Sequence, residues 1–387
     1  MSLLANIQSA LGAIGADIKS LFNRGSSKSG DILYSADAPG PDWLPCDGSA
    51  YLQSSYPVLY GKLGTIPTRN IGDFSSSSLP ASTTRKAMAY GNGIFVAIAY
   101  GTAIAATSND GINWVQRALP VSANWQSIAY GNGVFVAVTY NSAIAATSAD
   151  GVTWTQRTLP ASAYWQAVAY GNGTFLAITW TSNVIATSAD GVTWTQRSIP
   201  IYSYWNTLVF ANGLFIAMGG TSIQEYVTSP DGITWTQRLL PMAATIYSVA
   251  YGNGVFVALY YGTSANVFIS SDGITWDVYP VTAAANWSSI TYGNGVFVAI
   301  AAATRASAIA VSLNGIDWEV IPLPVYSPCK MIAHGNGVFV AIPYGSAIGA
   351  VASDARSYSY DPVSQFVVPN IESLCVRGTQ LKAYVRT

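Results

Sequence analysis

The feature that most constrains this 387-residue chain is one short motif that returns seven times. Its typical form is Tyr-Gly-Asn-Gly-Val-Phe-Val-Ala, at 130–137. A fixed period of about 40 residues is typical of repeat architectures, in which each unit packs against its neighbours. The central asparagines, spaced 40, 40, 40, 41, 41 and 42 residues apart, are Asn92, Asn132, Asn172, Asn212, Asn253, Asn294 and Asn336.

One repeat, taken between Trp165 and Pro200, predicts four β-strands. Asn-Gly at 172–173 and Asp-Gly at 190–191 are two-residue signals for β-hairpins. Four antiparallel strands per period match one blade of a β-propeller. The β-prone runs of this repeat are 166–170, 174–179, 184–188 and 192–199.

The strand after each Asn-Gly turn is apolar on both of its faces. In the second repeat one face carries Val134, Val136 and Val138, and the other carries Phe135 and Ala137. An antiparallel sheet with one face in water would alternate apolar with polar residues. Burial on both faces favours a blade between two neighbours over a one-sided sheet.

A second motif follows each pair of strands, as in Ser148-Ala-Asp150-Gly151-Val-Thr-Trp154. It resembles the Asp-box of sialidase-type propellers, with one residue fewer between Asp and Trp. We expect a structural role, in which the Asp accepts turn N–H groups and the Trp fills space between blades. Copies of the motif end at Trp114, Trp154, Trp194, Trp235, Trp276 and Trp318.

The first motif occurs seven times and the second only six, so the last repeat lacks a fourth strand. Phe74 precedes Pro80 by six residues, as Trp154 precedes Pro160 in a regular repeat. We therefore expect 71–79 to supply the closing strand of the last blade. Such a latch protects the sheet edges. It also places both chain ends on the face of the Asn-Gly turns and leaves the opposite face free.

The segments on either side of the repeats resemble the two halves of a phage tail-collar domain. The resemblance covers 31–70 and 357–387, and it implies that the propeller, 71–356, is an insertion in that domain. The motifs that carry the resemblance are WLPCDGS at 43–49, YPVLY at 56–60, Leu63-Gly64, FVVPN at 366–370 and AYV at 383–385.

The first 24 residues predict a short helix, followed by a flexible linker at 25–30. Their apolar residues alternate at spacings of three and four, which is a coiled-coil seam that accommodates trimers. A single amphipathic helix packed on the neighbouring domain is the alternative. The string AIGADIK at 13–19 resembles N-terminal helices of phage tail fibre proteins, which implies attachment to the virion. The seam consists of Leu4, Ile7, Leu11, Ile14, Ile18 and Leu21.

Composition argues against several classes of function. The net charge is −1 and only 9% of residues are charged, so we expect no nucleic-acid partner. No signal peptide and no transmembrane span are evident. Three cysteines, Cys46, Cys329 and Cys375, are too few for a disulfide framework and fit synthesis in a reducing cytoplasm.

The residues also argue against an enzyme. A glycosidase needs a carboxylate pair or a clustered arginine site, but Glu225 and Glu319 are the only glutamates of the repeats. One histidine, His334, and scattered cysteines cannot bind zinc, so we expect no metal and no cofactor. Most of the repeats' arginines share one repeat position and spread around the ring: Arg117, Arg157, Arg197 and Arg238.

Binding is the remaining interpretation. Aromatic side chains gather in the variable loops, where they would stack on sugar rings; packing between blades is the alternative for each of them. The candidate receptor-binding residues are Trp125, Tyr140, Trp165, Trp180, Tyr204, Trp205, Tyr260, Tyr261 and Trp287.

We therefore expect a homotrimeric, virion-located tail fibre or tip protein. Its N-terminus would join a phage tail or baseplate protein, and its propellers would bind a bacterial surface polysaccharide or an outer-membrane protein. A structural spacer without receptor contact and a glycan-cleaving enzyme are the alternatives.

Overall fold

The computed structural model describes residues 71–220, 223–260, 266–280, 286–301, 308–323 and 329–353, with the backbone of five short strands beyond them. The chain divides into two compact units, Arg69–Arg356 and a second made of Met1–Thr68 with Ser357–Thr387. Every regular element in the described residues is a β-strand, and no membrane-spanning helix occurs among them. The predicted helix at 1–24 and linker at 25–30 lie outside the described residues.

In the smaller unit, strands from before the repeats pair with strands from after them. Strand β28 pairs antiparallel with β1 and β2, and β27 pairs antiparallel with β3. The two segments that resemble halves of a tail-collar domain are therefore joined by strand pairing. The strands are β1 (Ile32–Ser35), β2 (Trp43–Pro45), β3 (Ala50–Leu52), β27 (Gln365–Val367) and β28 (Lys382–Arg386).

The first four repeats form one connected run of antiparallel strands. It is connected because long strands change partner half-way: β7 pairs with β6 through 115–124 and with β8 through 125–131. The strands are β5 (Arg85–Gly91), β6 (Ile94–Ser108), β7 (Val115–Gly131), β8 (Val134–Ser148), β9 (Thr155–Gly171), β10 (Thr174–Thr179), β11 (Thr181–Ser188), β12 (Thr195–Ala211), β13 (Leu214–Gly219), β14 (Ile223–Ser229) and β15 (Thr236–Ala244).

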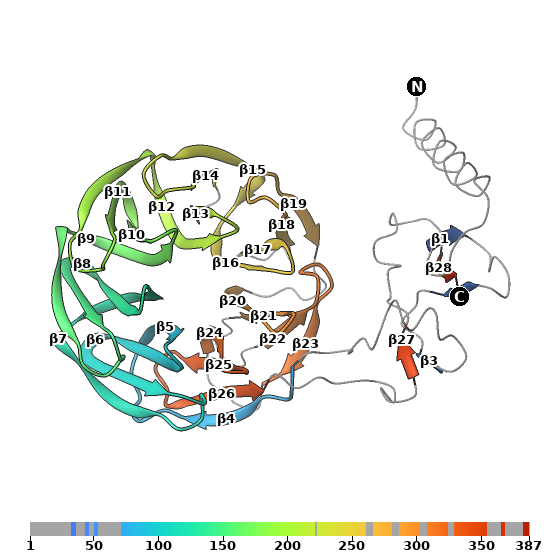
Figure 1. The fold of residues 1–387 in the computed structure, drawn as a ribbon, viewed down its shortest axis with the longest axis horizontal. Helices are drawn as coiled ribbons and strands as arrows, with labels where there is room; N and C mark the ends of the chain where they lie inside the picture. The colour runs from blue at the N-terminus through green and yellow to red at the C-terminus, as the bar shows by residue number, and fades with distance from the viewer. Residues whose placement is uncertain are drawn as a thin grey trace. The chain divides into compact units, whose positions relative to one another are not determined.

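The later repeats form separate four-stranded antiparallel sheets, and Figure 1 shows all the sheets of the larger unit arranged in a ring. The fifth repeat contains β16 (Ile246–Gly252), β17 (Val255–Tyr260), β18 (Asn266–Ser270) and β19 (Asp277–Pro280). The sixth contains β20 (Trp287–Gly293), β21 (Val296–Ala301), β22 (Ala308–Ser312) and β23 (Glu319–Pro322).

The last sheet takes its fourth strand from ahead of the first repeat. It contains β24 (Cys329–Gly335), β25 (Val338–Pro343), β26 (Ile348–Ser353) and β4 (Ser75–Ser78). Strand β4 pairs antiparallel with β26, from Ile348 opposite Ser78 to Val351 opposite Ser75. This is the pairing that the sequence predicts for the serine-rich segment, and Figure 1 shows the two strands side by side.

The repeated Tyr-Gly-Asn-Gly motif has two separate structural roles. Asn132 and Gly133 both have positive φ, 47° and 76°, as the tight hairpin turn requires. The first glycine has a different task, since a Cβ atom at Gly131 would lie 2.0 Å from the ring of Tyr170 in the next repeat. The motif therefore makes a turn and receives the neighbour's aromatic ring. The fourth repeat is the exception, with Ala211 at the first position.

The Asp-Gly turns are capped by their own aspartates. In the fourth repeat the carboxylate of Asp231 accepts the backbone N–H groups of Ile233 and Thr234 at 2.8 and 2.7 Å, and the hydroxyl of Ser229 at 2.9 Å. The indole of Trp235 donates to the Gly232 carbonyl at 3.2 Å. The Asp-Gly…Trp motif therefore holds a turn, as the sequence predicts.

The central strands are buried on both faces, which confirms the expectation from their apolar pattern. Phe135, Val136, Ala137 and Val138 have no exposed surface. Phe135, in the second repeat, packs with residues of the first repeat, whereas Val136 packs with residues of the third repeat. The two faces of each sheet thus contact different neighbours.

The first and last repeats contact each other as other neighbours do. A Cβ atom at Gly335 would lie 2.2 Å from the ring of Tyr90, and the amide of Asn336 donates to the Asn109 carbonyl at 2.9 Å. Arg85, which is 1% exposed, adds a contact of its own. Its guanidinium donates to the carbonyl of Ser346 in the last repeat at 3.3 Å.

We expect Arg85→Ala to destabilise the ring where its ends meet. Arg85 donates to the carbonyls of Ser346 and Ala81, which are partly buried, so we expect each lost hydrogen bond to cost about 1 kcal/mol. Urea denaturation of the full chain measures the loss. Arg157→Ala, which removes one bond to Thr147 within a single sheet, is the control. An equal effect of the two variants would contradict a special role for Arg85.

The turn aspartates predict a loss of stability in acid. The pKa of Asp231 is lowered to about 2 because backbone N–H groups of Thr234 and Ile233 donate to its carboxylate. The pKa is also lowered at Asp110, Asp150, Asp190 and Asp272. Since these values lie below the unfolded value of about 3.9, their stabilisation is complete above about pH 5 and is lost as the pH falls towards 2.

The chain contains a natural control for this prediction. In the sixth repeat a neutral side-chain acceptor replaces the aspartate: Asn314 accepts N–H bonds from Ile316 and Asp317, both at 2.9 Å, and its own amide donates to the Asp317 carboxylate at 2.9 Å. A variant with Asn at all five aspartates is therefore expected to lose less stability than the wild type between pH 5 and pH 2.5. Parallel losses, measured as urea midpoints, would contradict the prediction.

Candidate functional site

The innermost strands of the ring enclose a channel of about 540 Å³. The residue that follows the buried start of each innermost strand lines this channel. This position differs between repeats, whereas the turns do not. The seven residues, one from each repeat, are Lys86, Gln126, Gln166, Asn206, Tyr247, Ser288 and Lys330.

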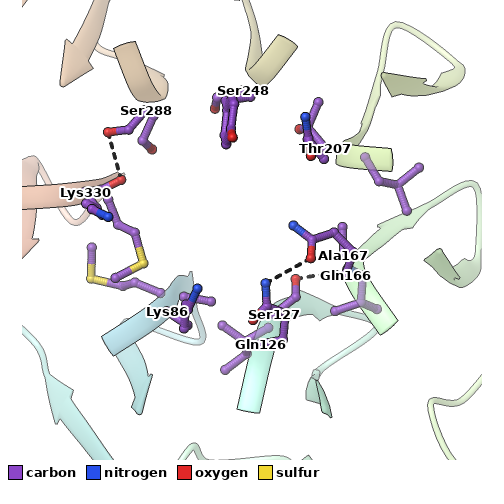
Figure 2. A pocket seen from close by; sticks show the side chains of 18 of the residues that line it. Lys86, Gln126, Ser127, Gln166, Ala167, Thr207, Ser248, Ser288 and Lys330 are labelled. Atoms are coloured by element: carbon purple, nitrogen blue, oxygen red, sulfur yellow. Dashed lines mark hydrogen bonds between the residues drawn. The ribbon is translucent and has the colours of Figure 1, made fainter. Parts of the chain in front are cut away.

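Hydrogen bonds between neighbouring repeats hold several of these side chains in place. Gln126 Nε2 donates to Gln166 Oε1 at 3.0 Å, and the amide of Asn206 donates to the Ile246 carbonyl at 3.2 Å. Ser288 Oγ donates to the Lys330 carbonyl at 3.2 Å. Figure 2 shows Lys86, Gln126, Gln166 and Ser288 around the open centre.

In three repeats the next residue along the strand is a serine that ties neighbouring innermost strands together. Ser127 Oγ accepts the backbone N–H of Val168 at 3.1 Å, and Ser248 Oγ accepts that of Ile290 at 3.2 Å. These hydroxyls supply partners to backbone groups at the inner sheet edges, which no strand covers. The channel wall is therefore braced from one sheet to the next.

At one end the channel opens into a hollow of about 360 Å³, here called the channel mouth. Four of its five aromatic residues directly follow the stretch of their repeat that pairs with the innermost strand, so the mouth lies on the face opposite the Asn-Gly turns. The fifth, Tyr247, lies on the innermost strand β16 itself. Its lining combines rings, amides and cations: Lys86, Tyr100, Gln126, Tyr140, Gln166, Trp180, Asn206, Tyr247 and Tyr344.

Two lysines from the first and last repeats meet at this end. Lys330 Nζ lies 4.3 Å from the ring centre of Tyr344, and Lys86 Nζ lies 5.7 Å from the same ring and 5.5 Å from that of Tyr100. Burial lowers the pKa of Lys86, and repulsion by the Lys330 ammonium lowers it further. The two ammonium groups are therefore held near each other by cation–π contacts with the same tyrosine ring.

Four aromatic side chains form a continuous row across the edge of the mouth, here called the aromatic row, and its two middle members line the mouth. Tyr140 contacts Tyr164 at 4.9 Å and Trp180 at 6.2 Å between ring centres, and Trp180 contacts Tyr204 edge-on at 5.7 Å. The backbone of Trp180 is fixed by bonds to Tyr164 and Trp205 at 2.7 and 2.8 Å. Tyr164 and Tyr204 are more than 40% exposed.

The structure corrects four of the candidate binding residues. Trp125, Trp165 and Trp205 have no exposed surface and Trp287 is 2% exposed. Their rings pack between neighbouring sheets, and the indoles of Trp125 and Trp165 donate to the carbonyls of Val121 and Ala161. These four tryptophans therefore belong to the core and pack between blades, which is the alternative to receptor binding.

The other candidates divide into three groups. Tyr140, Trp180 and Tyr204 lie together in the aromatic row. Tyr260 is half-buried against the core between the fourth and fifth sheets and does not line the mouth. Tyr261 lies outside the described residues, as do the six residues of the N-terminal seam, Leu4, Ile7, Leu11, Ile14, Ile18 and Leu21.

Side chains that could act in catalysis or bind a metal are far apart from one another in the described part of the chain. Arg117, Arg157, Arg197 and Arg238 each donate to a threonine of their own sheet. His334 packs against Phe339 with ring centres 4.6 Å apart and planes tilted by 48°. No group of three or more His, Cys, Asp or Glu residues that could hold a metal occurs among the described residues.

The sequence interpretation omitted the polar residues of the mouth. Gln126, Gln166 and Asn206 each follow the buried tryptophan of their repeat directly. Alignment of the repeats would show this position to be polar or aromatic throughout. Successive side chains of a strand point to opposite sides, so the side chain at this position faces the channel when the preceding tryptophan is buried. Lys86 and Lys330 are recognised only when first and last repeats are taken as neighbours.

The ring of radial antiparallel sheets defines the class of this protein, a β-propeller. A family model described as the DUF6242 beta propeller domain matches residues 72–204. No curated protein sequence matches the chain.

Solved propellers resemble the structure. Virginiamycin B lyase from Staphylococcus aureus gives a TM-score of 0.63 at 11% identity, covering 73% of this chain and 99% of that one. YCF48 bound to D1 peptide gives 0.59 at 15% identity, covering 77% and 98%. A streptogramin B lyase gives 0.64 at 11% identity, covering 73% and 97%. At these identities the likeness shows the fold alone.

The corrected site predicts effects of different size for two tryptophans of the same repeat. Trp165→Ala should lower the free energy of unfolding by about 3–5 kcal/mol, because it empties a buried site between two sheets. Trp180→Ala should cost about 1 kcal/mol or less, because its ring lies at the surface. Urea denaturation distinguishes them, and equal losses would contradict the assignment.

Proposed function

We propose that this protein is a receptor-binding protein of a phage tail fibre or tail tip. The propeller would attach the virion to a bacterial surface glycan or outer-membrane receptor through the face with the channel mouth, and it would bind without cleaving. The observation that carries the proposal is the aromatic row of Tyr164, Tyr140, Trp180 and Tyr204, whose two middle members line a hollow that amides also line.

The chemistry of this face suits a carbohydrate. Aromatic faces stack on the apolar faces of sugar rings, and the amides of Gln126, Gln166 and Asn206 offer directional hydrogen bonds to hydroxyl groups. Each ring of the row contacts at least one other, which restricts its rotamers. Binding would therefore cost less side-chain entropy than it would for isolated rings.

The proposal includes the architecture that the sequence predicts. The seven repeats would be the seven blades of a closed propeller, inserted in a split tail-collar domain. Pairing of β28 with β1 and of β27 with β3 supports the split, because it joins the chain before the repeats to the chain after them. Pairing of β4 with β26 supports the closure.

The N-terminal residues complete the proposed function. The helix at 1–24 would form a trimeric coiled coil that joins a tail or baseplate protein, so that the assembled protein is located in the virion. Three propellers per fibre would then engage the cell surface together. Weak single sites gain strongly from such multivalency.

Competition for adsorption tests this proposal. Purified wild-type protein should block adsorption of its phage, and the double variant Tyr140→Ala, Trp180→Ala should block at least tenfold less well. Ile233→Ala, which removes a half-exposed apolar side chain from the Asp-Gly turn face, is the matched control. Failure of the wild type to compete would favour a structural spacer. New reducing ends released from host polysaccharide would indicate a glycan-cleaving enzyme instead.

A further inference from the structure

The channel mouth contains an unbalanced positive charge. Lys86 lines the mouth and Lys330 lines the adjoining channel, and both ammonium groups lie over the ring of Tyr344. None of the described residues that line the mouth or the channel is Asp or Glu. In a chain with 18 acidic and 17 basic residues, this end of the channel concentrates cations without lining carboxylates.

The two cations are brought together by closure of the ring. Lys86 lies on β5 and Lys330 on β24, the innermost strands of the first and last repeats. Both occupy the repeat position that carries Gln126 and Gln166 elsewhere. The charge is therefore confined to the sector where the first and last repeats meet, whereas the amides and the aromatic row belong to the second, third and fourth repeats.

This arrangement matches a ligand with three kinds of surface. A carboxylate would sit between two ammonium groups, which form the strongest class of hydrogen bond available to it. Ring hydroxyls would meet the amides of Gln126, Gln166 and Asn206, and a sugar face would meet Tyr140 or Trp180. The hollow of about 360 Å³ is at the lower end of the range for small-molecule sites.

We infer that the channel mouth binds an acidic sugar residue, whose carboxylate lies between Lys86 and Lys330. This inference rests on the proposed glycan-binding function and specifies its ligand class. It assigns Tyr344 a positioning role, because its ring holds the two ammonium groups. Neutral sugars would lack the charged contact and would bind the same face more weakly.

The repeats supply the matched variants for a test. Lys86→Gln places at the first repeat the residue that the second and third carry, and Lys330→Ser places at the last the residue that the sixth carries. The full chain would be titrated calorimetrically with trigalacturonate, with its methyl ester as the uncharged control. Mannose 6-phosphate distinguishes a phosphate site from a carboxylate site.

We expect the double variant to bind trigalacturonate at least about tenfold less tightly, since each charged hydrogen bond is worth about 1.5–3 kcal/mol and 1.4 kcal/mol is tenfold. Wild-type binding should weaken with added salt, and the methyl ester should bind weakly to both proteins. Equal binding of acid and ester, no binding of the acid, affinity unaffected by the lysine changes, or preference for the phosphate would overturn the inference.

The adsorption assay separates this inference from the proposed function. If the wild type binds trigalacturonate through its lysines but does not compete with phage, the acidic-sugar site stands and the receptor function fails. If the wild type competes and the lysine variant competes equally well, the receptor function stands and the lysine pair is not its recognition site.

Discussion

The contact on which this structure depends is the packing of an aromatic ring onto a glycine of the preceding repeat. Tyr170 covers Gly131 so closely that no Cβ atom fits between them, and Tyr90 covers Gly335 in the same way. A single sheet of this kind has two apolar faces and cannot bury either alone. Its stability therefore comes from its neighbours, and the last repeat gains its second neighbour only by meeting the first.

This closure also creates the candidate site. The walls of the channel come from equivalent positions in every repeat, and hydroxyls such as Ser127 brace one inner strand to the next. With the scaffold braced in this way, the side chain that projects into the channel is free to differ. Glutamine, asparagine, serine, tyrosine and lysine all occupy this position, and the chemistry of the mouth depends on their order around the ring.

Most of the repeat's local structure could be predicted from sequence, because Asn-Gly and Asp-Gly specify turns through backbone geometry alone. The apolar residues around Phe135 likewise predict burial on both faces of the strand. The similarity in sequence between 73–80 and the end of a regular repeat predicts β4. The sequence around Trp165 does not show whether its side chain is buried. A tryptophan near a strand end is compatible with packing between sheets and with ligand binding, and only the distance between neighbouring sheets distinguishes the two. Lys86 and Lys330 come together only because the first and last repeats meet, so no local sequence pattern predicts their proximity.

The pairing of β4 with β26 has a consequence for how the protein is made. A ribosome releases the serine-rich strand first and its partner last, with all the other repeats between them. During synthesis the nascent sheets stack one upon another while the terminal one stays uncovered. Closure of the ring therefore cannot precede the synthesis of β26, and until then the serine-rich strand has no partner in its own sheet.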